Sequence, residues 1–386
     1  MRPWLSIPPD SPFPLTNLPY GATPQGVVVA IGDMMLDAGA TASALGSAYA
    51  EVLARPSLDA LLAAGPSAWS SVRELLTQSL GDESMRGLVQ RHLRPRDDTA
   101  LVLPFAVADY VDFYASEYHA TNLGRLLRPG EPPLMPNYKH LPVGYHGRAG
   151  TVVVSGTDVR RPSGQRAGDD GPVFGPSERL DIEAEVGFVV GVPSARGEPV
   201  TTEAFADHVF GVCLVNDWSA RDIQAWEYRP LGPFLGKSFA TSISPWVVPL
   251  AALDDARVWP ASAQSPLLPY LRERQACGLD LRLEIRVNGE LVSRPPYKSM
   301  HWSPAQMLAH LTVNGASLRT GDLFASGTVS GPRRQEWGSL IELWDNEHFL
   351  ADGDEVVITA YAPGLDGTTI GFGEVRGRIS PATHPG

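Results

Sequence analysis

Apolar and polar residues follow two different periods along this chain, and the change of period divides it into regions. Short apolar runs bounded by turn-forming residues lie at residues 26–33 and 209–215, and further runs lie near the end at 354–361 and 371–379. Such runs are typical of β-strands. Between residues 40 and 92, apolar side chains instead recur every three to four positions in Ala- and Leu-rich segments, as they do in amphipathic helices.

The second half of the chain contains further short elements. Residues 279–287 alternate between polar and apolar side chains, and the following Asn288-Gly289 pair favours a tight hairpin turn. Residues 304–311 have the pattern of a short helix, and residues 338–343 have that of an apolar strand. The pattern as a whole predicts a mainly β protein with some α-helix.

The length of the chain predicts more than one domain. A single hydrophobic core usually stops growing near roughly 250–300 residues, and this chain has 386. The polar segment at residues 94–99 has the character of a linker. We therefore expect an amino-terminal domain over residues 1–104, with a helical segment, and a second domain over residues 105–386. The pattern assigns no functional role to residues 255–294.

Composition and charge restrict the classes of partner. The chain is 43% apolar and 19% charged, as soluble globular proteins are, and its formal net charge is −12. Without a basic run it lacks the feature that binds phosphate backbones, so nucleic acid is not expected as a partner. The two cysteines fit a reducing compartment, and no apolar stretch has the length of a signal peptide or a membrane span. We expect a cytoplasmic protein without a membrane partner.

Acidic residues alternate with apolar residues in the segment LDIEAEVGFVV. A strand here would place Asp181, Glu183 and Glu185 on one face. Adjacent like charges are tolerated on an exposed sheet, but next to the apolar residues 186–190 they require a compensating cation. Oxygen ligands without cysteine favour Mg²⁺ or Ca²⁺ over zinc. We favour a metal site, and a solvated sheet face is the alternative.

A second acidic position precedes a predicted short helix. Asp217 follows the apolar run 209–215, and Ser219 has the character of a helix N-cap. Three hydrogen-bonding side chains share one face of this helix: Arg221, Gln224 and Tyr228. Lys237 follows on a turn bounded by Gly. A metal or an anionic substrate would need such a face, although an ordinary solvated helix has the same spacing.

One histidine and one buried acid are further candidates. If residues 109–122 form a helix, Asp112 and His119 share a face, and His119 could act as a base. A lone histidine is more often a structural hydrogen-bonding group. Glu342, inside the apolar residues 338–343, needs a partner, for which a histidine is the natural candidate. Arg128 could bind an anion or only end a helix.

Six motifs stand out within residues 105–249 and 313–378: DFYASEYHATN, LPVGYHGRAGTVVVSG, LDIEAEVGFVVG, NDWSARDIQAWEYRPLGPFLGKSFATSISPWVVP, ASGTVSGP and GSLIEL. Together they resemble the fumarylacetoacetate hydrolase family. The resemblance implies a small SH3-like amino-terminal β domain, a larger mixed-β domain of the family type, and a homodimer. The segments SIPPDSPFPLTNLPYG and VAIGD also resemble the start of an amino-terminal domain that simpler family members lack.

The resemblance also implies roles for individual residues. The implied site for Mg²⁺, Ca²⁺ or both comprises Asp112, Glu183, Glu185, Asp217, Lys237 and Thr241. The implied catalytic residues are His119 as general base, Glu342 as its orienting partner, and Arg221, Gln224 and Lys237 as oxyanion donors. The implied substrate-binding residues are Tyr114, Arg128, Tyr145, Gln224, Tyr228 and Thr328.

The implied reaction is metal-dependent hydrolysis of a carbon–carbon bond. The small-molecule substrate would be 4-fumarylacetoacetate, split into fumarate and acetoacetate in the last step of tyrosine and phenylalanine breakdown. A lyase acting on a 2-keto acid is the alternative within the family, but His119 with Glu342 and the extra amino-terminal domain favour the hydrolase. A non-enzymatic protein with structural carboxylates is a third hypothesis, disfavoured because acids, base and oxyanion donors occur together.

Overall fold

The amino-terminal part of the computed structural model, which describes residues 4–264 and 266–383, is built on a four-stranded antiparallel sheet. Its strands are β1 (Tyr20–Thr23), β2 (Gly26–Ile31), β3 (Met34–Asp37) and β4 (Leu93–Pro95). Gly32 and Asp33 connect β2 to β3, and Gly32 has a φ of 57°, which glycine adopts without strain. The predicted strand and its turn are therefore confirmed.

Five helices lie between β3 and β4, in the region where the sequence predicts helical periodicity. They are α1 (Ala38–Ala44), α2 (Ala50–Leu53), α3 (Asp59–Ala63), α4 (Gly65–Gly81) and α5 (Arg86–Val89). Their apolar faces pack with the sheet in one core, which includes Val29, Leu61 and Leu76. None of the helices in the described ranges is long and apolar enough to cross a membrane.

The larger carboxyl-terminal part contains an eight-stranded sheet, whose main order is β6-β5-β21-β12-β13-β15-β7 with β16 paired to β13. In chain order these strands are β5 (Tyr110–Phe113), β6 (Gly144–His146), β7 (Val152–Val154), β12 (Ala184–Val190), β13 (Val209–Asp217), β15 (Thr241–Ile243), β16 (Val248–Pro249) and β21 (Leu323–Ala325). Strands β12 and β13 are buried at every position. Their continuous apolar runs follow from this burial on both faces.

A five-stranded sheet in the order β20-β19-β22-β23-β8 completes the larger part. Its strands are β8 (Val159–Arg160), β19 (Arg282–Val287), β20 (Glu290–Ser293), β22 (Glu355–Pro363) and β23 (Thr369–Ser380). One core joins residues of both large sheets, among them Phe188, Leu214, Ile285 and Ile358. The two sheets thus enclose the main hydrophobic core, and the predicted hairpin and terminal strands are confirmed.

Short elements surround these sheets. The remaining strands form three pairs: β9 (Ser163–Arg166) with β10 (Val173–Pro176), β11 (Leu180–Asp181) with β14 (Ser219–Ala220), and β17 (Arg257–Val258) with β18 (Gly278–Leu279). The remaining helices are α6 (Glu117–Leu127), α7 (Phe205–His208), α8 (Arg221–Glu227), α9 (Pro304–Thr312) and α10 (Leu340–Leu343). Helix α9 confirms the helix expected at residues 304–311.

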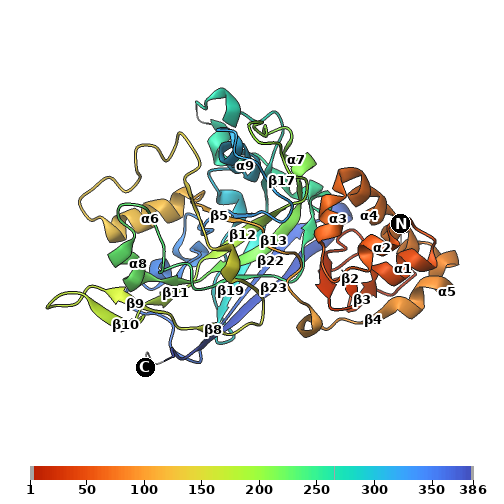
Figure 1. Ribbon diagram of the computed structural model, residues 1–386, viewed down its shortest axis with the longest axis horizontal. Helices are drawn as coiled ribbons and strands as arrows, with labels where there is room; N and C mark the ends of the chain where they lie inside the picture. The colour runs from red at the N-terminus through yellow and green to blue at the C-terminus, as the bar shows by residue number, and fades with distance from the viewer. Residues whose placement is uncertain (1–3, 265, 384–386) are drawn as a thin grey trace.

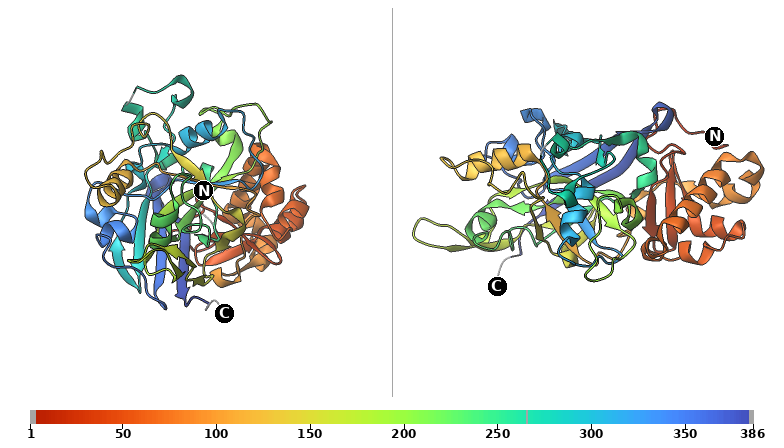
Figure 2. Two further views of the ribbon diagram at one scale, coloured as in Figure 1. Left: turned by 60° about the vertical axis from the view of Figure 1, so that its left-hand side comes forward. Right: turned by 90° about the horizontal axis from the view of Figure 1, so that it is seen from above.

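The two parts of the chain are joined by packing and hydrogen bonds. Tyr20 and Val247 exchange backbone hydrogen bonds of 2.8 and 2.7 Å. The Phe210 ring of β13 lies with its centroid 5.4 Å from that of Tyr20 and 5.3 Å from that of Trp69. In Figure 1 the helices α1 to α5 occupy one end of the molecule, while α6 and α8 lie at the opposite end. The view from above in Figure 2 shows the same separation.

Two local predictions are wrong. Residues 109–122 do not form one helix, because Tyr110–Phe113 pairs with β6 and β21 as a buried strand and the helix begins after the N-cap Ser116. Residues 338–343 do not form a strand; they include helix α10, whose first amides donate to the Asp181 carboxylate. In both cases a tertiary partner overrides the local pattern.

Two further details near the acidic motif also differ from prediction. The strand expected over residues 180–190 is interrupted at Ile182, so Asp181 belongs to β11 and Glu185 to β12. Asp181 therefore does not share a continuous strand face with the other two acids. Ser219 lies in β14 and does not cap α8, since its hydroxyl donates to the carbonyl of Asp217 over 3.0 Å.

Candidate active site

Four buried carboxylates meet at one place in the eight-stranded sheet. Asp112 lies in β5, Glu185 in β12 and Asp217 at the end of β13, while Glu183 lies just before β12. One oxygen from each lies within 4.8 Å of the corresponding oxygens of the others. The structure thus brings together the four carboxylates that the resemblance implied as metal ligands.

The pairing of the strands explains why these four carboxylates lie close together. Strand β21 lies between β5 and β12, and its Ala325 pairs with both Asp112 and Gly187. Glu185 lies two positions from Gly187 and so on the same face of β12. Asp217 ends the neighbouring β13, where its amide donates to the Glu183 carbonyl over 3.1 Å. Acids from three separate segments of the sequence are therefore brought together in or beside paired strands.

The electrostatics of the cluster require additional positive charge. Burial and the neighbouring Asp217 charge raise the pKa of Asp112 well above its usual value, and burial and the Asp112 charge do the same for the pKa of Glu185. The Asp112 Oδ1 and Glu185 Oε1 atoms are buried and have no hydrogen-bond partner among the described residues. A divalent cation, for which carboxylate oxygens are suitable ligands, fits this arrangement.

Lys237 and Thr241 contact the cluster from the side of β13. The Lys237 Nζ atom lies 2.6 Å from both Glu183 Oε2 and Asp217 Oδ2. Thr241 donates to Asp217 Oδ1 over 3.0 Å, and Tyr145 donates to Asp217 Oδ2 over 3.1 Å. Burial raises the pKa of Glu183, but Lys237 and Arg221 outweigh burial and hold that pKa below its usual range.

Helix α8 supplies a second cation and an amide. Arg221 begins the helix, and its Nη2 atom lies 2.7 Å from Glu183 Oε1. Its Nη1 atom donates to Gln224 Oε1 over 3.1 Å, so the Gln224 amide nitrogen is left to donate elsewhere. The predicted shared face of Arg221 and Gln224 is thus present, with Arg221 beside the carboxylates.

His119 lies on α6, on the other side of Glu183. Its Nδ1 atom lies 2.7 Å from Glu342 Oε2, and its Nε2 atom lies 3.8 Å from Glu183 Oε1. The expected pairing of Glu342 with a histidine is therefore present. Burial raises the pKa of Glu342, but His119 and neighbouring hydrogen bonds outweigh burial and keep it below its usual value.

Three further residues, which the sequence did not indicate as part of the site, donate hydrogen bonds to Glu342. Asn122 and Ser330 donate to Glu342 Oε1 over 2.8 and 3.1 Å, and Ser339 donates to Glu342 Oε2 over 2.7 Å. Asn122 follows His119 by three positions on one helix, a spacing that could have indicated it. Ser339 precedes Glu342 by three positions, so its spacing is equally informative, whereas Ser330 is twelve residues away and carries no comparable signal.

The other expected substrate-binding residues lie at varying distances from this centre. The Tyr114 ring lies edge-on to His119, with 5.3 Å between the ring centroids. Thr328 is buried, and its hydroxyl has no partner among the described residues. Arg128 donates to the Pro133 carbonyl, and the Tyr228 hydroxyl accepts from Arg229 over 2.7 Å. Neither Arg128 nor Tyr228 has an ion pair or hydrogen bond to the four carboxylates in the described structure.

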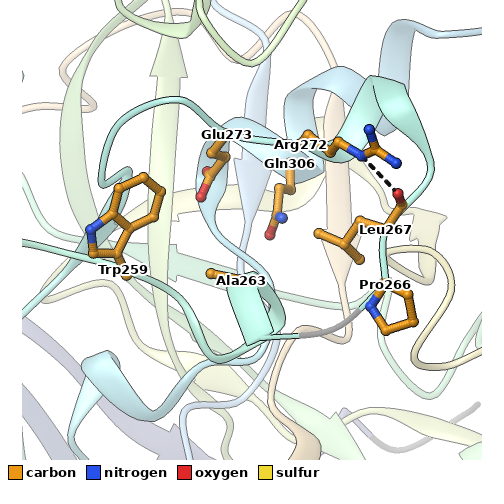
Figure 3. Close-up of a pocket in the computed structure, with 7 residues that line it drawn as sticks. All are labelled: Trp259, Ala263, Pro266, Leu267, Arg272, Glu273 and Gln306. Atoms are coloured by element: carbon orange, nitrogen blue, oxygen red, sulfur yellow. Dashed lines mark hydrogen bonds between the residues drawn. The ribbon is translucent and has the colours of Figure 1, made fainter.

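A pocket of about 480 Å³ lies apart from these residues. Figure 3 shows its lining, which comprises Trp259, Ala263, Pro266, Leu267, Arg272, Glu273 and Gln306. No carboxylate of the cluster belongs to it. Most of the lining comes from residues 255–274, the connector to which the sequence pattern assigned no role.

Comparison with known proteins identifies the family. The family model "Fumarylacetoacetase N-terminal" matches residues 16–104, and "Fumarylacetoacetate (FAA) hydrolase C-terminal" matches residues 110–380. The chain belongs to the fumarylacetoacetate hydrolase family. It is 43% identical to the fumarylacetoacetase of Homo sapiens and 40% identical to that of Arabidopsis thaliana, in each case over 99% of both chains.

Two solved structures share the fold. A fumarylacetoacetate hydrolase from Exiguobacterium antarcticum is 18% identical, with a TM-score of 0.57 over 94% of this chain and 99% of that chain. A maleylpyruvate hydrolase from Sphingobium sp. SYK-6 is 16% identical, with a TM-score of 0.53 over 94% of this chain and 100% of that chain. At these identities the likeness concerns the fold alone.

Proposed function

We propose that this protein hydrolyses the carbon–carbon bond of 4-fumarylacetoacetate, giving fumarate and acetoacetate as the last step of tyrosine and phenylalanine breakdown. The observation that carries the proposal is the pairing of His119 with Glu342 beside the four-carboxylate cluster. The full-length similarity to proteins named fumarylacetoacetase supports the choice of substrate.

The cluster would hold the divalent cation of this reaction. Asp112, Glu183, Glu185 and Asp217 are the proposed ligands, and their oxygen-only donor set suits Mg²⁺ or Ca²⁺. When bound, such a cation acts as a Lewis acid toward carbonyl oxygens. Lys237 and Thr241 support the site by holding the Asp217 carboxylate from both of its oxygens.

His119 is the proposed general base. Glu342 accepts a hydrogen bond from the Nδ1–H group of His119, which leaves Nε2 as the free acceptor that takes a proton from water. The hydroxide adds to the carbonyl carbon of the fumaryl group, which becomes the second carboxylate of fumarate. The carbon–carbon bond then breaks, and the proton held by His119 is available for the acetoacetate carbon that leaves.

Arg221, Gln224 and Lys237 are the proposed donors to the oxyanion formed in this addition. Arg221 and Lys237 carry positive charge into a buried site, where such donors act more strongly than in water. For the binding of the substrate carboxylates and carbonyls we propose a set of six residues. These are Tyr114, Arg128, Tyr145, Gln224, Tyr228 and Thr328.

The test is fumarate release from fumarylacetoacetate by the purified protein with Mg²⁺ or Ca²⁺, repeated after chelation. We expect release that depends on the cation, and we expect His119→Ala to lower kcat by at least ~100-fold because the base is removed. The exposed His348→Ala is the matched control and should keep the wild-type rate. A wild-type protein without fumarate release would contradict the proposed substrate. Fumarate release by His119→Ala at close to the wild-type rate would contradict the role of His119 as the base, whereas turnover of a 2-keto acid that does not need His119 would indicate the lyase.

We also propose that the chain forms a homodimer in the cytoplasm and consists of two domains divided near residue 104. The two family models, which end at residue 104 and begin at residue 110, support the division. The net charge of −12 supports the absence of a nucleic-acid partner. Sedimentation analysis should give twice the monomer mass of 41.5 kDa.

A further inference from the structure

Asp181 is a buried carboxylate close to the active site that is not one of the four clustered acids. It has no exposed surface, and it lies in β11 beside the start of α8. Two strands of only two residues each, β11 and β14, pair here and bring Asp181 opposite Ser219. This pairing places the carboxylate between α8 and α10.

Each oxygen of Asp181 accepts two N–H groups. Oδ2 accepts the Arg221 Nε proton over 2.7 Å and the Ile341 amide proton over 3.2 Å. Oδ1 accepts the amide protons of Leu340 over 2.8 Å and Ile182 over 2.7 Å. All of its strong acceptor positions are therefore used by the protein, which explains why Asp181 offers no oxygen to the cluster.

The two helices joined by Asp181 each carry a different part of the proposed chemistry. Arg221 on α8 turns its remaining nitrogens toward Glu183 and Gln224. Helix α10 carries Glu342, which lies 2.7 Å from His119. The Asp181 carboxylate therefore bonds both to Arg221, the proposed oxyanion donor, and to helix α10, which carries the proposed partner of His119.

We propose that Asp181 is a positioning residue that fixes Arg221 and the Glu342 turn relative to each other, so that base and oxyanion donor face one substrate together. The inference rests on the proposed function and extends it to a residue outside the metal, base and substrate contacts. Without the Asp181 charge, Arg221 keeps only Glu183 as an anionic partner and its guanidinium turns toward the cluster. The first amides of α10 then lose an acceptor, and the Glu342 side chain moves away from His119.

The first test is Asp181→Asn, which keeps the shape of the side chain and removes its charge. We expect kcat to fall by about 10- to 100-fold with KM changed by less than about threefold, because the lost interactions act on the transition state. The affinity for Mg²⁺ or Ca²⁺, measured by titration calorimetry, should change by less than threefold. A larger loss of cation affinity at unchanged kcat would mean that Asp181 supports the metal site, and would overturn the proposal.

The matched control is Asp322→Asn. Asp322 is also a largely buried aspartate bonded to an arginine, since it accepts the Arg319 backbone N–H over 2.8 Å. In the described structure, none of its side-chain hydrogen bonds or ion pairs reaches an active-site residue. Both variants should lower the melting temperature, and only Asp181→Asn should lower kcat. Equal loss of kcat in the two variants would show a general loss of stability and would contradict positioning.

A double-mutant cycle separates positioning from an independent structural effect. Because Asp181 acts partly through Arg221, Asp181→Asn should lower kcat by a clearly smaller factor in an Arg221→Gln background than in the wild-type protein, and the part that remains reflects the Glu342 turn. Full additivity of the two substitutions would overturn the proposal. If Asp181→Asn does not fold, Asp181→Glu serves instead, because it keeps the charge but its longer side chain cannot reach Arg221 and α10 in the same geometry.

A crystal structure of the variant distinguishes failure of this inference from failure of the proposed function. We expect the separation of His119 Nδ1 and Glu342 Oε2 to exceed about 3.5 Å, beyond a hydrogen bond. Unchanged positions of Arg221 and Glu342 would overturn the inference even if the wild-type protein released no fumarate. Displaced positions together with an inactive wild-type protein would keep the positioning role and refute only the substrate.

Discussion

At the scale of single residues, the role open to each acid depends on which of its oxygens are already bonded within the protein. Both oxygens of Glu342 accept hydrogen bonds, so it can orient His119 but has little capacity to bind a cation. Asp112 and Glu185 each keep one buried oxygen without a partner among the described residues. Glu342 is thereby suited to orient the base, whereas Asp112 and Glu185 are suited to bind the metal.

Replacing Glu342 with Gln tests this division. The substitution keeps the size of the side chain but removes the charge that stabilises the protonated imidazole of His119. We expect kcat to fall by at least ~100-fold, with the affinity for the divalent cation unchanged. Steady-state kinetics and cation titration measure the two effects, and Glu347→Gln in the exposed turn after α10 is the matched control. Retention of more than a third of the wild-type kcat would contradict the orienting role.

At the scale of elements, short segments whose local sequence is ambiguous place the chemistry. Helix α10 has only four residues and depends on Asp181 to accept its first amide protons. Helix α9 has a comparable dependence at its own start. Its N-cap Ser303 forms a capping box with Gln306, and the Ser303 hydroxyl also donates to Glu273, which lines the pocket in Figure 3.

Glu273 should make stability depend on pH. Burial raises the pKa of Glu273 from its ordinary value of 4.5 to about 7. The native state therefore keeps a proton that the unfolded chain loses, so this residue lowers the free energy of unfolding as pH rises from about 4.5 to about 7. The full effect is roughly 3 kcal/mol above pH 7.

Urea unfolding of Glu273→Gln checks this prediction. Because the amide cannot ionise, the variant should be more stable than the wild-type protein at pH 8, and this advantage should disappear at pH 4.5. The exposed Glu198→Gln should leave the pH dependence unchanged. A Glu273→Gln variant with no advantage at pH 8 would show that the carboxylate is ionised in the native protein without cost.

At the scale of the whole molecule, the amino-terminal part lies at the opposite end from α6 and α8 (Figures 1 and 2). Among the described residues, none before residue 105 belongs to the carboxylate cluster. The amino-terminal part instead contacts β13, the strand that ends at the site. Phe210 near the start of that strand packs against Tyr20 and Trp69, and Asp217 ends it.

Phe210→Ala should therefore lower stability without a matching loss of activity. Removing this buried ring is expected to lower the free energy of unfolding by about 3–5 kcal/mol. Asp217 is seven residues away, roughly 23 Å along the strand, so kcat at 25 °C should change by less than about threefold. Denaturant unfolding and steady-state kinetics measure both. The exposed Phe174→Ala should change stability by less than about 0.5 kcal/mol, and equal effects of the two substitutions would contradict the packing role of Phe210.

The sequence by itself determined the elements whose local pattern and final environment agree. The long apolar run of β13 predicts a buried strand, the Gly32-Asp33 turn predicts the β2–β3 hairpin, and the periodicity of residues 40–92 predicts helices. It also indicated Glu183 and Glu185, because alternating carboxylates beside an apolar run require compensation. These features depend on interactions within a few residues.

Only the tertiary structure decided how these residues meet. The pattern of residues 109–122 suits one helix, but pairing with β6 and β21 makes Tyr110–Phe113 a strand and leaves His119 to the following helix. Asp181 has the same spacing as Glu183 and Glu185, yet the pairing of β11 with β14 directs it to Arg221 and α10. Strand pairing between distant segments selects the direction of each side chain, and local periodicity carries no information about that partner.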